Sequence, residues 1–382
     1  MRLPIRPRGL AAVAALTLAL VTGAGTAHAV AAGPGDPPPF IAPFGTVSEV
    51  ASTVPGNGDV NPYGTVVIPE SAGELHQGNV LVSNFNDMMN HQGTGTTLVQ
   101  VSPGGQVEQF AQIDPTGLPG SCPGGVGLTT ALTVLPGGWV VVGSLPTSDG
   151  TSATMQAGCL LVLDEHGTVR ETLAGNGING PWDLTSVSHG DLTQLFVTNV
   201  LNGTVAASPN VVNGGTVLRL TLRTGPGDQP PQWIHTTRIG SGFGERTDSN
   251  ALVVGPTGVG LGRDGKLYVA DTLGNRITEI PRAETRDSDD GTGRQVSIAD
   301  HLNGPLGLAI APNGDILTVN GGDGFIVETD PCGKQVASQL LDSQGAPPPP
   351  GGGGALFGLA VAPDGQGVYF VDDNENQLNL LH

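Results

Sequence analysis

Residues 304–320 read GPLGLAIAPNGDILTVN, and two other stretches of the chain repeat this pattern. Residues 256–271 read PTGVGLGRDGKLYVAD, and residues 356–372 read LFGLAVAPDGQGVYFVD. Each copy holds two apolar segments joined by a glycine-containing turn, which is typical of two antiparallel strands. A strand–turn–strand unit that recurs every roughly 40–50 residues predicts a β-propeller, a ring of similar sheets called blades.

The second strand of each unit can be traced through the whole chain, which gives six blades. Its last residue is usually Asn or Asp: the six are Asn84, Ser144, Asn199, Asp271, Asn320 and Asp372. The last unit lacks a fourth strand, and residues 45–51 (GTVSEVA) resemble the missing one. We therefore predict an all-β fold, a six-bladed β-propeller closed by an N-terminal strand that pairs with the C-terminal blade and protects its edge.

One unit also carries a more specific resemblance. Residues 267–277 read LYVADTLGNRI, and together with the preceding strand they resemble the NHL repeat. Residues 305–330 and 356–380 resemble it more loosely, so three of the six blades carry the resemblance. It implies a six-bladed ring related in shape to the gluconolactonase and amidating-lyase propellers, without implying their activities.

The N-terminal segment has the pattern of an export signal. Arg2, Arg6 and Arg8 precede an apolar run at 10–21, and residues 27–29 read AHA, a small-x-small cleavage site. We predict a signal peptide at 1–29, a flexible Pro/Gly leader at 30–39 and one propeller domain at 40–382. The apolar run is too short for a permanent membrane anchor, so a secreted bacterial protein is expected.

The charge balance restricts the partners. The chain has 15 Lys and Arg against 34 Asp and Glu, a net charge of −19. Such a chain repels nucleic acid and anionic membranes. A monomer is expected, whose partner is a small molecule, a glycan or another protein.

The candidate ligand site follows from the connections between strands. The long ones, at 85–96, 145–158 and 200–215, fall on one side of the ring, here called the insertion rim; the turns after the inner strands fall on the opposite side, the turn rim. The ring of Asn84, Ser144, Asn199, Asp271, Asn320 and Asp372 should line the channel mouth at the insertion rim. Asn199, Asp271 and Asp372 are the candidate ligands of a Ca²⁺ ion or another divalent cation, which prefers oxygen donors. The alternative is that these side chains cap turns.

These residues favour a binding scaffold with its ligand site at the channel mouth, rather than an enzyme. The alternative is a metal-dependent hydrolase or lyase of small metabolites that uses the same mouth. In the gluconolactonase-like family a Glu on an inner strand completes the metal site, whereas Asp183 is the only acid predicted on an inner strand here. That difference counts against a lactonase, and no catalytic residue is assigned.

Three cysteines in an exported chain predict one disulfide and one free thiol. Cys122 precedes the inner strand of the second blade, and Cys159 begins the third strand of that blade. Both fall on the insertion rim, whereas Cys332 falls in a turn on the opposite rim. We predict a Cys122–Cys159 disulfide.

Overall fold

The computed structural model describes residues 28–29, 38–225, 227–249, 251–342 and 356–382. The predicted signal peptide and leader therefore lie almost entirely outside the described residues. Within the described part, no helix combines the length and the apolar character needed to cross a membrane. Helical structure there amounts to α1 (Thr204–Ala207) and a 3-10 turn at Ser152–Thr154.

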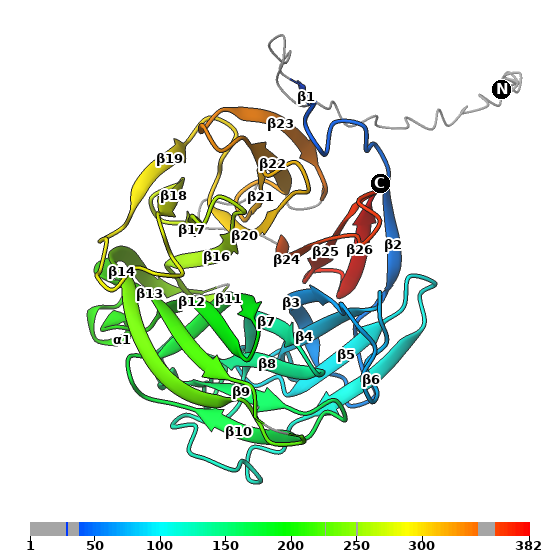
Figure 1. Ribbon diagram of the computed structural model, residues 1–382, viewed down its shortest axis with the longest axis vertical. Helices are drawn as coiled ribbons and strands as arrows, with labels where there is room; N and C mark the ends of the chain where they lie inside the picture. The colour runs from blue at the N-terminus through cyan, green and yellow to red at the C-terminus, as the bar shows by residue number, and fades with distance from the viewer. Residues whose placement is uncertain (1–27, 30–37, 226, 250, 343–355) are drawn as a thin grey trace, which may run out of the picture.

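Six antiparallel sheets stand around a central axis, which confirms the predicted six-bladed propeller (Figure 1). The first blade contains β3 (Val60–Val67), β4 (Val80–Asn86), β5 (Thr97–Val101) and β6 (Val107–Gln112). The second contains β7 (Leu128–Leu135), β8 (Trp139–Ser144), β9 (Cys159–Leu163) and β10 (Val169–Leu173). The third contains β11 (Gly180–His189), β12 (Leu192–Val200), β13 (Val212–Arg223), β14 (Gln232–Asp248) and β15 (Leu252–Val254).

The fourth blade contains β16 (Pro256–Leu261), β17 (Leu267–Asp271), β18 (Arg276–Ile280) and β19 (Arg294–Ile298). The fifth contains β20 (Pro305–Ile310), β21 (Ile316–Asn320), β22 (Phe325–Thr329), β23 (Gln335–Leu340) and β1 (His28–Ala29). The sixth contains β24 (Leu356–Val361), β25 (Val368–Asp372), β26 (Gln377–Leu381) and β2 (Val47–Ser52). The first strand of each blade lies nearest the axis and contacts the first strands of both neighbouring blades.

Ring closure is also confirmed. β2 pairs antiparallel with β26, with Val47 opposite Leu381 and Ser52 opposite Gln377. The segment before β2 is held against the fifth blade, because the Phe40 and Ile41 N–H groups donate to the Glu328 carboxylate at 2.6 and 2.8 Å. The N-terminal strand therefore completes the sixth blade.

Apolar side chains of adjacent blades form the core. β4, β8, β17, β21 and β25 are buried along their whole length, because each lies inside its blade and has a neighbouring blade on either face. Between the first two blades, Leu81 and Leu98 lie in one apolar cluster with Leu132 and Val142. The outermost strands, such as β6, are mostly exposed.

The predicted disulfide is present. Cys122 and Cys159 are bonded, with 5.4 Å between their Cα atoms, and Cys332 is free and exposed. The bond joins the segment before β7 to the start of β9.

Candidate functional site

The predicted ligand ring lies at the ends of the second strands, but it is buried. Asn84, Ser144, Asn199, Asp271, Asn320 and Asp372 are each at most 3% exposed. Their polar atoms turn back into the protein: Ser144 Oγ accepts from Gly127 N–H, and Asn320 Nδ2 donates to His301 O. In the described part of the chain, Asn84 and Asn320 leave a buried amide oxygen unpartnered. Ligand binding by this ring therefore stays a prediction.

The three predicted metal ligands are occupied by other contacts. Asn199 Oδ1 accepts from two backbone N–H groups, and Asp271 forms an ion pair with Arg276 at 2.7 Å. Asp372 Oδ1 accepts from two more backbone N–H groups. Among the described residues, no three His, Cys, Asp or Glu side chains are grouped to hold a metal ion. This donor set does not fit a divalent cation, which needs several free oxygens at one point.

An aromatic layer closes the channel toward the insertion rim. Tyr63, Trp182 and Phe357 stand near the starts of β3, β11 and β24, and each is at most 3% exposed. The ring centroids of Tyr63 and Phe357 lie 3.9 Å apart, and those of Trp182 and Phe357 lie 6.0 Å apart. Because Trp182 and Phe357 belong to opposite blades, their contact crosses the axis. We call these three residues and the stacked Phe85 the aromatic layer.

Beyond this layer the channel contains a cavity on the side of the turn rim. This cavity of about 350 Å³ is lined by the inner strands of all six blades. The burial of β3, β11, β20 and β24 decreases toward their C-terminal ends, where the turns begin. The cavity, here called the axial cavity, is therefore accessible from the turn rim, the side opposite to the predicted mouth.

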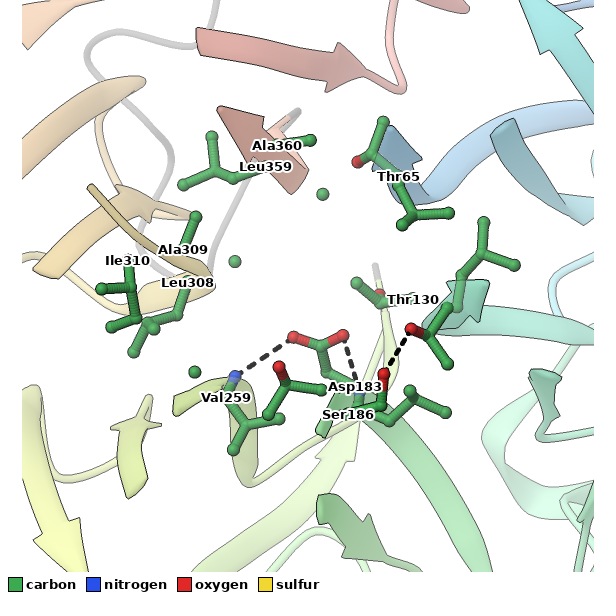
Figure 2. Close-up of a pocket in the computed structure, with 18 of the residues that line it drawn as sticks. Thr65, Thr130, Asp183, Ser186, Val259, Leu308, Ala309, Ile310, Leu359 and Ala360 are labelled. Atoms are coloured by element: carbon green, nitrogen blue, oxygen red, sulfur yellow. Dashed lines mark hydrogen bonds between the residues drawn. The ribbon is translucent and has the colours of Figure 1, made fainter. Parts of the chain in front are cut away.

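Asp183 is the one acidic side chain among the residues that line this cavity (Figure 2). It lies on β11 and is 8% exposed. The Leu184 N–H donates to Oδ1 at 2.8 Å, and the Val259 N–H, from the next blade, donates to Oδ2 at 3.1 Å. Burial raises the pKa of Asp183 to about 8, against the lowering effect of these two hydrogen bonds.

Hydroxyl groups surround the carboxyl. Thr65, Thr130, Thr133, Thr185 and Ser186 line the same cavity, together with aliphatic side chains and with no Lys, Arg or His among the lining residues. Thr133 and Ser186 hydrogen-bond each other at 2.9 Å. The Thr65 and Thr130 hydroxyls are buried without a partner. The axial cavity thus combines a proton donor with an uncharged lining of threonine, serine and aliphatic side chains.

The sequence contained one signal for this site: Asp183 is the only acid predicted on an inner strand. The repeated Asn or Asp at the strand ends is the stronger sequence pattern, and it points to the opposite end of the channel. The aromatic layer, which decides the end from which the channel is accessible, is formed by residues of three different blades.

Comparisons with known proteins show the fold. No family model and no curated protein match the chain. Among solved structures, a gluconolactonase from Xanthomonas campestris aligns over 94% of this chain and 98% of its own length, with 16% sequence identity and a TM-score of 0.53. A luciferin-regenerating enzyme aligns over 88% of this chain and 94% of its own length, with 12% sequence identity and a TM-score of 0.53. Regucalcin from Agrobacterium tumefaciens is described as a calcium-binding protein. It aligns over 86% of this chain and 92% of its own length, with 14% sequence identity and a TM-score of 0.52.

The expected binding scaffold needs correction. Solved structures with this ring include a gluconolactonase and a luciferin-regenerating enzyme, and these neighbours agree better with the alternative of a hydrolase or lyase. The geometry gives a physical reason, because the strand-end residues expected to present a ligand face are buried.

Proposed function

We propose that this protein is a hydrolase or lyase of small, uncharged molecules and that the reaction takes place in the axial cavity beside Asp183. The observation that carries the proposal is the largely buried, hydrogen-bonded carboxyl of Asp183 at the wall of a solvent-accessible cavity. Carboxyl groups with raised pKa values in cavities are typical of acid–base sites. The enzymes named above support the proposal because they show what rings of this shape do elsewhere.

Asp183 carries the proton in this mechanism. With a pKa of about 8 it is protonated at neutral pH, so it can donate its proton to the leaving oxygen or nitrogen of a bound molecule. The resulting carboxylate is stabilised by the Leu184 and Val259 N–H groups. It recovers a proton from the attacking water in a hydrolysis, or from the substrate carbon in an elimination.

The remaining lining residues restrict the substrate. Apart from Asp183, the side chains that line the cavity are uncharged threonine, serine and aliphatic residues. An anion would enter a cavity that has an acid and no basic lining residue, in a protein with a net charge of −19. A neutral ester, lactone or substituted alcohol is therefore favoured over a phosphate or a carboxylate.

A divalent cation receives no part in this mechanism. Regucalcin is described as calcium-binding, but the donor set of Asn199, Asp271 and Asp372 does not fit such an ion. The proposed mechanism therefore uses no metal ion. Metal analysis of the purified protein tests separately whether Ca²⁺ is bound.

The remaining parts of the proposal concern the whole chain. We propose an exported bacterial monomer with a signal peptide at 1–29, a leader at 30–39 and one domain at 40–382. The resemblance to NHL repeats, which three blades carry, is part of the same proposal.

The test is turnover of a panel of neutral esters, lactones and β-substituted alcohols by the wild type and by Asp183→Asn. We expect turnover by the wild type and a loss of about 100-fold or more in the variant, the usual contribution of a general acid. Asp59→Asn is the matched control, because Asp59 is also buried, at 4% exposure, and accepts hydrogen bonds away from the axis. The control should keep its turnover.

A third variant separates the two candidate sites. If Asp372→Asn abolishes turnover while Asp183→Asn does not, the reaction belongs to the strand-end ring and our assignment is wrong. No turnover of any panel member by the wild type would also count against the proposal.

A further inference from the structure

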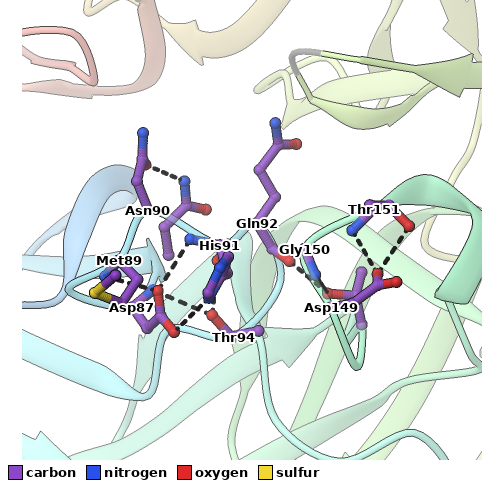
Figure 3. Close-up of polar contacts among 11 residues, drawn as sticks. Asp87, Met89, Asn90, His91, Gln92, Thr94, Asp149, Gly150 and Thr151 are labelled. Carbon is purple, nitrogen blue, oxygen red and sulfur yellow. Dashed lines mark hydrogen bonds and ion pairs between the residues drawn. The ribbon is translucent and has the colours of Figure 1, made fainter.

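The loop that follows β4 is built around one carboxylate. Asp87 Oδ1 accepts from the N–H groups of Met89 and His91, both at 2.9 Å, and the Asn90 N–H donates to the Asp87 carbonyl at 2.8 Å. A bridge between Asn86 and Gln92 closes the loop at its base. The backbone of residues 87–91 is therefore a fixed turn, and Figure 3 shows Asp87, Met89, Asn90 and His91 on it.

Two methionines of this turn are exposed to solvent. Met88 and Met89 are 69% and 68% exposed, the largest values among the exposed large hydrophobic residues of the described chain. The whole sequence has four methionines, and two of them are adjacent in this turn. The other two are Met1 and Met155. A methionine side chain is flexible and ends in a polarizable thioether, so both sulfurs can turn toward a common ligand.

His91 presents a third donor on the same turn. Its Nδ1 lies 3.1 Å from Asp87 Oδ2, and its side chain is 51% exposed. An ionised carboxylate can only accept, so Nδ1 carries the proton and Nε2 keeps its lone pair. A carboxylate on the far nitrogen is the arrangement that orients histidine ligands of metals.

We propose that Met88, Met89 and His91 form a surface site for Cu(I), separate from the axial cavity and beyond the proposed function. Thioether and imidazole donors form a soft set, which selects Cu(I) over Ca²⁺ and Mg²⁺. The one carboxylate within the turn is occupied by backbone N–H groups and by His91. Asp149, on the neighbouring loop, accepts from Thr151 and Thr154.

The test is an anaerobic titration of the untagged chain with Cu(I), with bicinchoninate as the competing chelator and ascorbate as reductant. Cys332→Ser is the parent protein, because the exposed Cys332 thiol would also bind Cu(I). We expect one Cu(I) per chain held against the chelator. Replacing both thioethers by the similarly sized Leu, in Met88→Leu/Met89→Leu, should weaken binding about tenfold or more.

Two further variants address the histidine. His91→Ala should weaken binding like the double Leu variant, and Asp87→Asn should weaken it less, because Asp87 is a positioning residue that fixes the ring. Full transfer of Cu(I) from the parent protein to the chelator would overturn the proposal. So would equal affinity of the parent protein and the double Leu variant, both with unchanged circular dichroism.

Discussion

Asp183 is a carboxyl that the fold buries almost completely, with no basic residue among those that line its cavity. An ionised carboxylate in such a place is costly, and the group responds by holding its proton. Its two N–H donors come from β11 and from the neighbouring β16, so the cavity wall itself fixes the carboxyl. One residue thus has the protonation state that an acid catalyst needs at neutral pH.

This protonation makes stability depend on pH. The pKa of Asp183 is about 8 in the folded protein against 3.8 as the ordinary value, so between these limits the folded state binds the extra proton. Its contribution is present below about pH 4 and is lost as pH rises to about 8, with a slope of at most about 1.4 kcal/mol per pH unit. Urea unfolding of the wild type and Asp183→Asn at pH 5, 6, 7 and 8 measures it. A difference between the two proteins that does not change with pH would contradict the assignment.

For single residues, the sequence predicted the position of an acidic side chain on its strand better than the groups that surround it in the folded protein. Asp271 was correctly placed at a strand end, but its pairing with Arg276 depends on the turn between β17 and β18. Asp183 was recognisable as an isolated acid, yet its burial depends on residues of the other blades. Side-chain chemistry was visible in the sequence, whereas the electrostatic surroundings were not.

Among the elements, the second blade carries the one covalent tether of the described chain. The Cys122–Cys159 bond spans 37 residues and joins the segment before β7 to β9, around the insertion at 145–158. It restricts the unfolded chain and holds that insertion to its blade.

Removal of the tether should destabilise the protein. We expect Cys122→Ser/Cys159→Ser to lower the free energy of unfolding by about 4 kcal/mol, from the entropy of closing a loop of this length. Guanidinium unfolding of the double variant against Cys332→Ser measures the loss, and reduction of the wild type should give a similar one. Unchanged midpoints would show that the bond does not stabilise this blade.

Strand positions were predictable because local patterns determine them. Apolar runs ended by Gly turns located the first and second strands of every blade, and the GTVSEVA segment was correctly assigned to ring closure. The 17-residue β14 and the added strand β15 were not predicted. Their sequence lacks the repeat, and β15 is fixed by pairing with the end of β14.

The whole molecule is a ring whose axial channel differs at its two ends. The aromatic layer fills it toward the insertion rim, and the axial cavity leaves it accessible from the turn rim. The sequence predicted the channel mouth at the insertion rim, whereas the accessible end is the opposite one, because aromatic contacts between opposite blades fill the channel on the predicted side. We therefore propose that substrate reaches Asp183 from the turn rim.

The most direct test is to obstruct the turn-rim end of the channel and measure kcat/KM for the best substrate of the panel, with a substitution at an exposed residue of an insertion as the control. Ala360 lines the axial cavity and is partly exposed, so the indole of Ala360→Trp should occupy space that the substrate needs and lower kcat/KM about tenfold or more, a loss of about 1.4 kcal/mol or more. Val211 is 54% exposed in the 200–215 insertion, so Val211→Trp should leave kcat/KM unchanged. Full activity of Ala360→Trp together with loss in Val211→Trp, with both variants folded, would contradict the account.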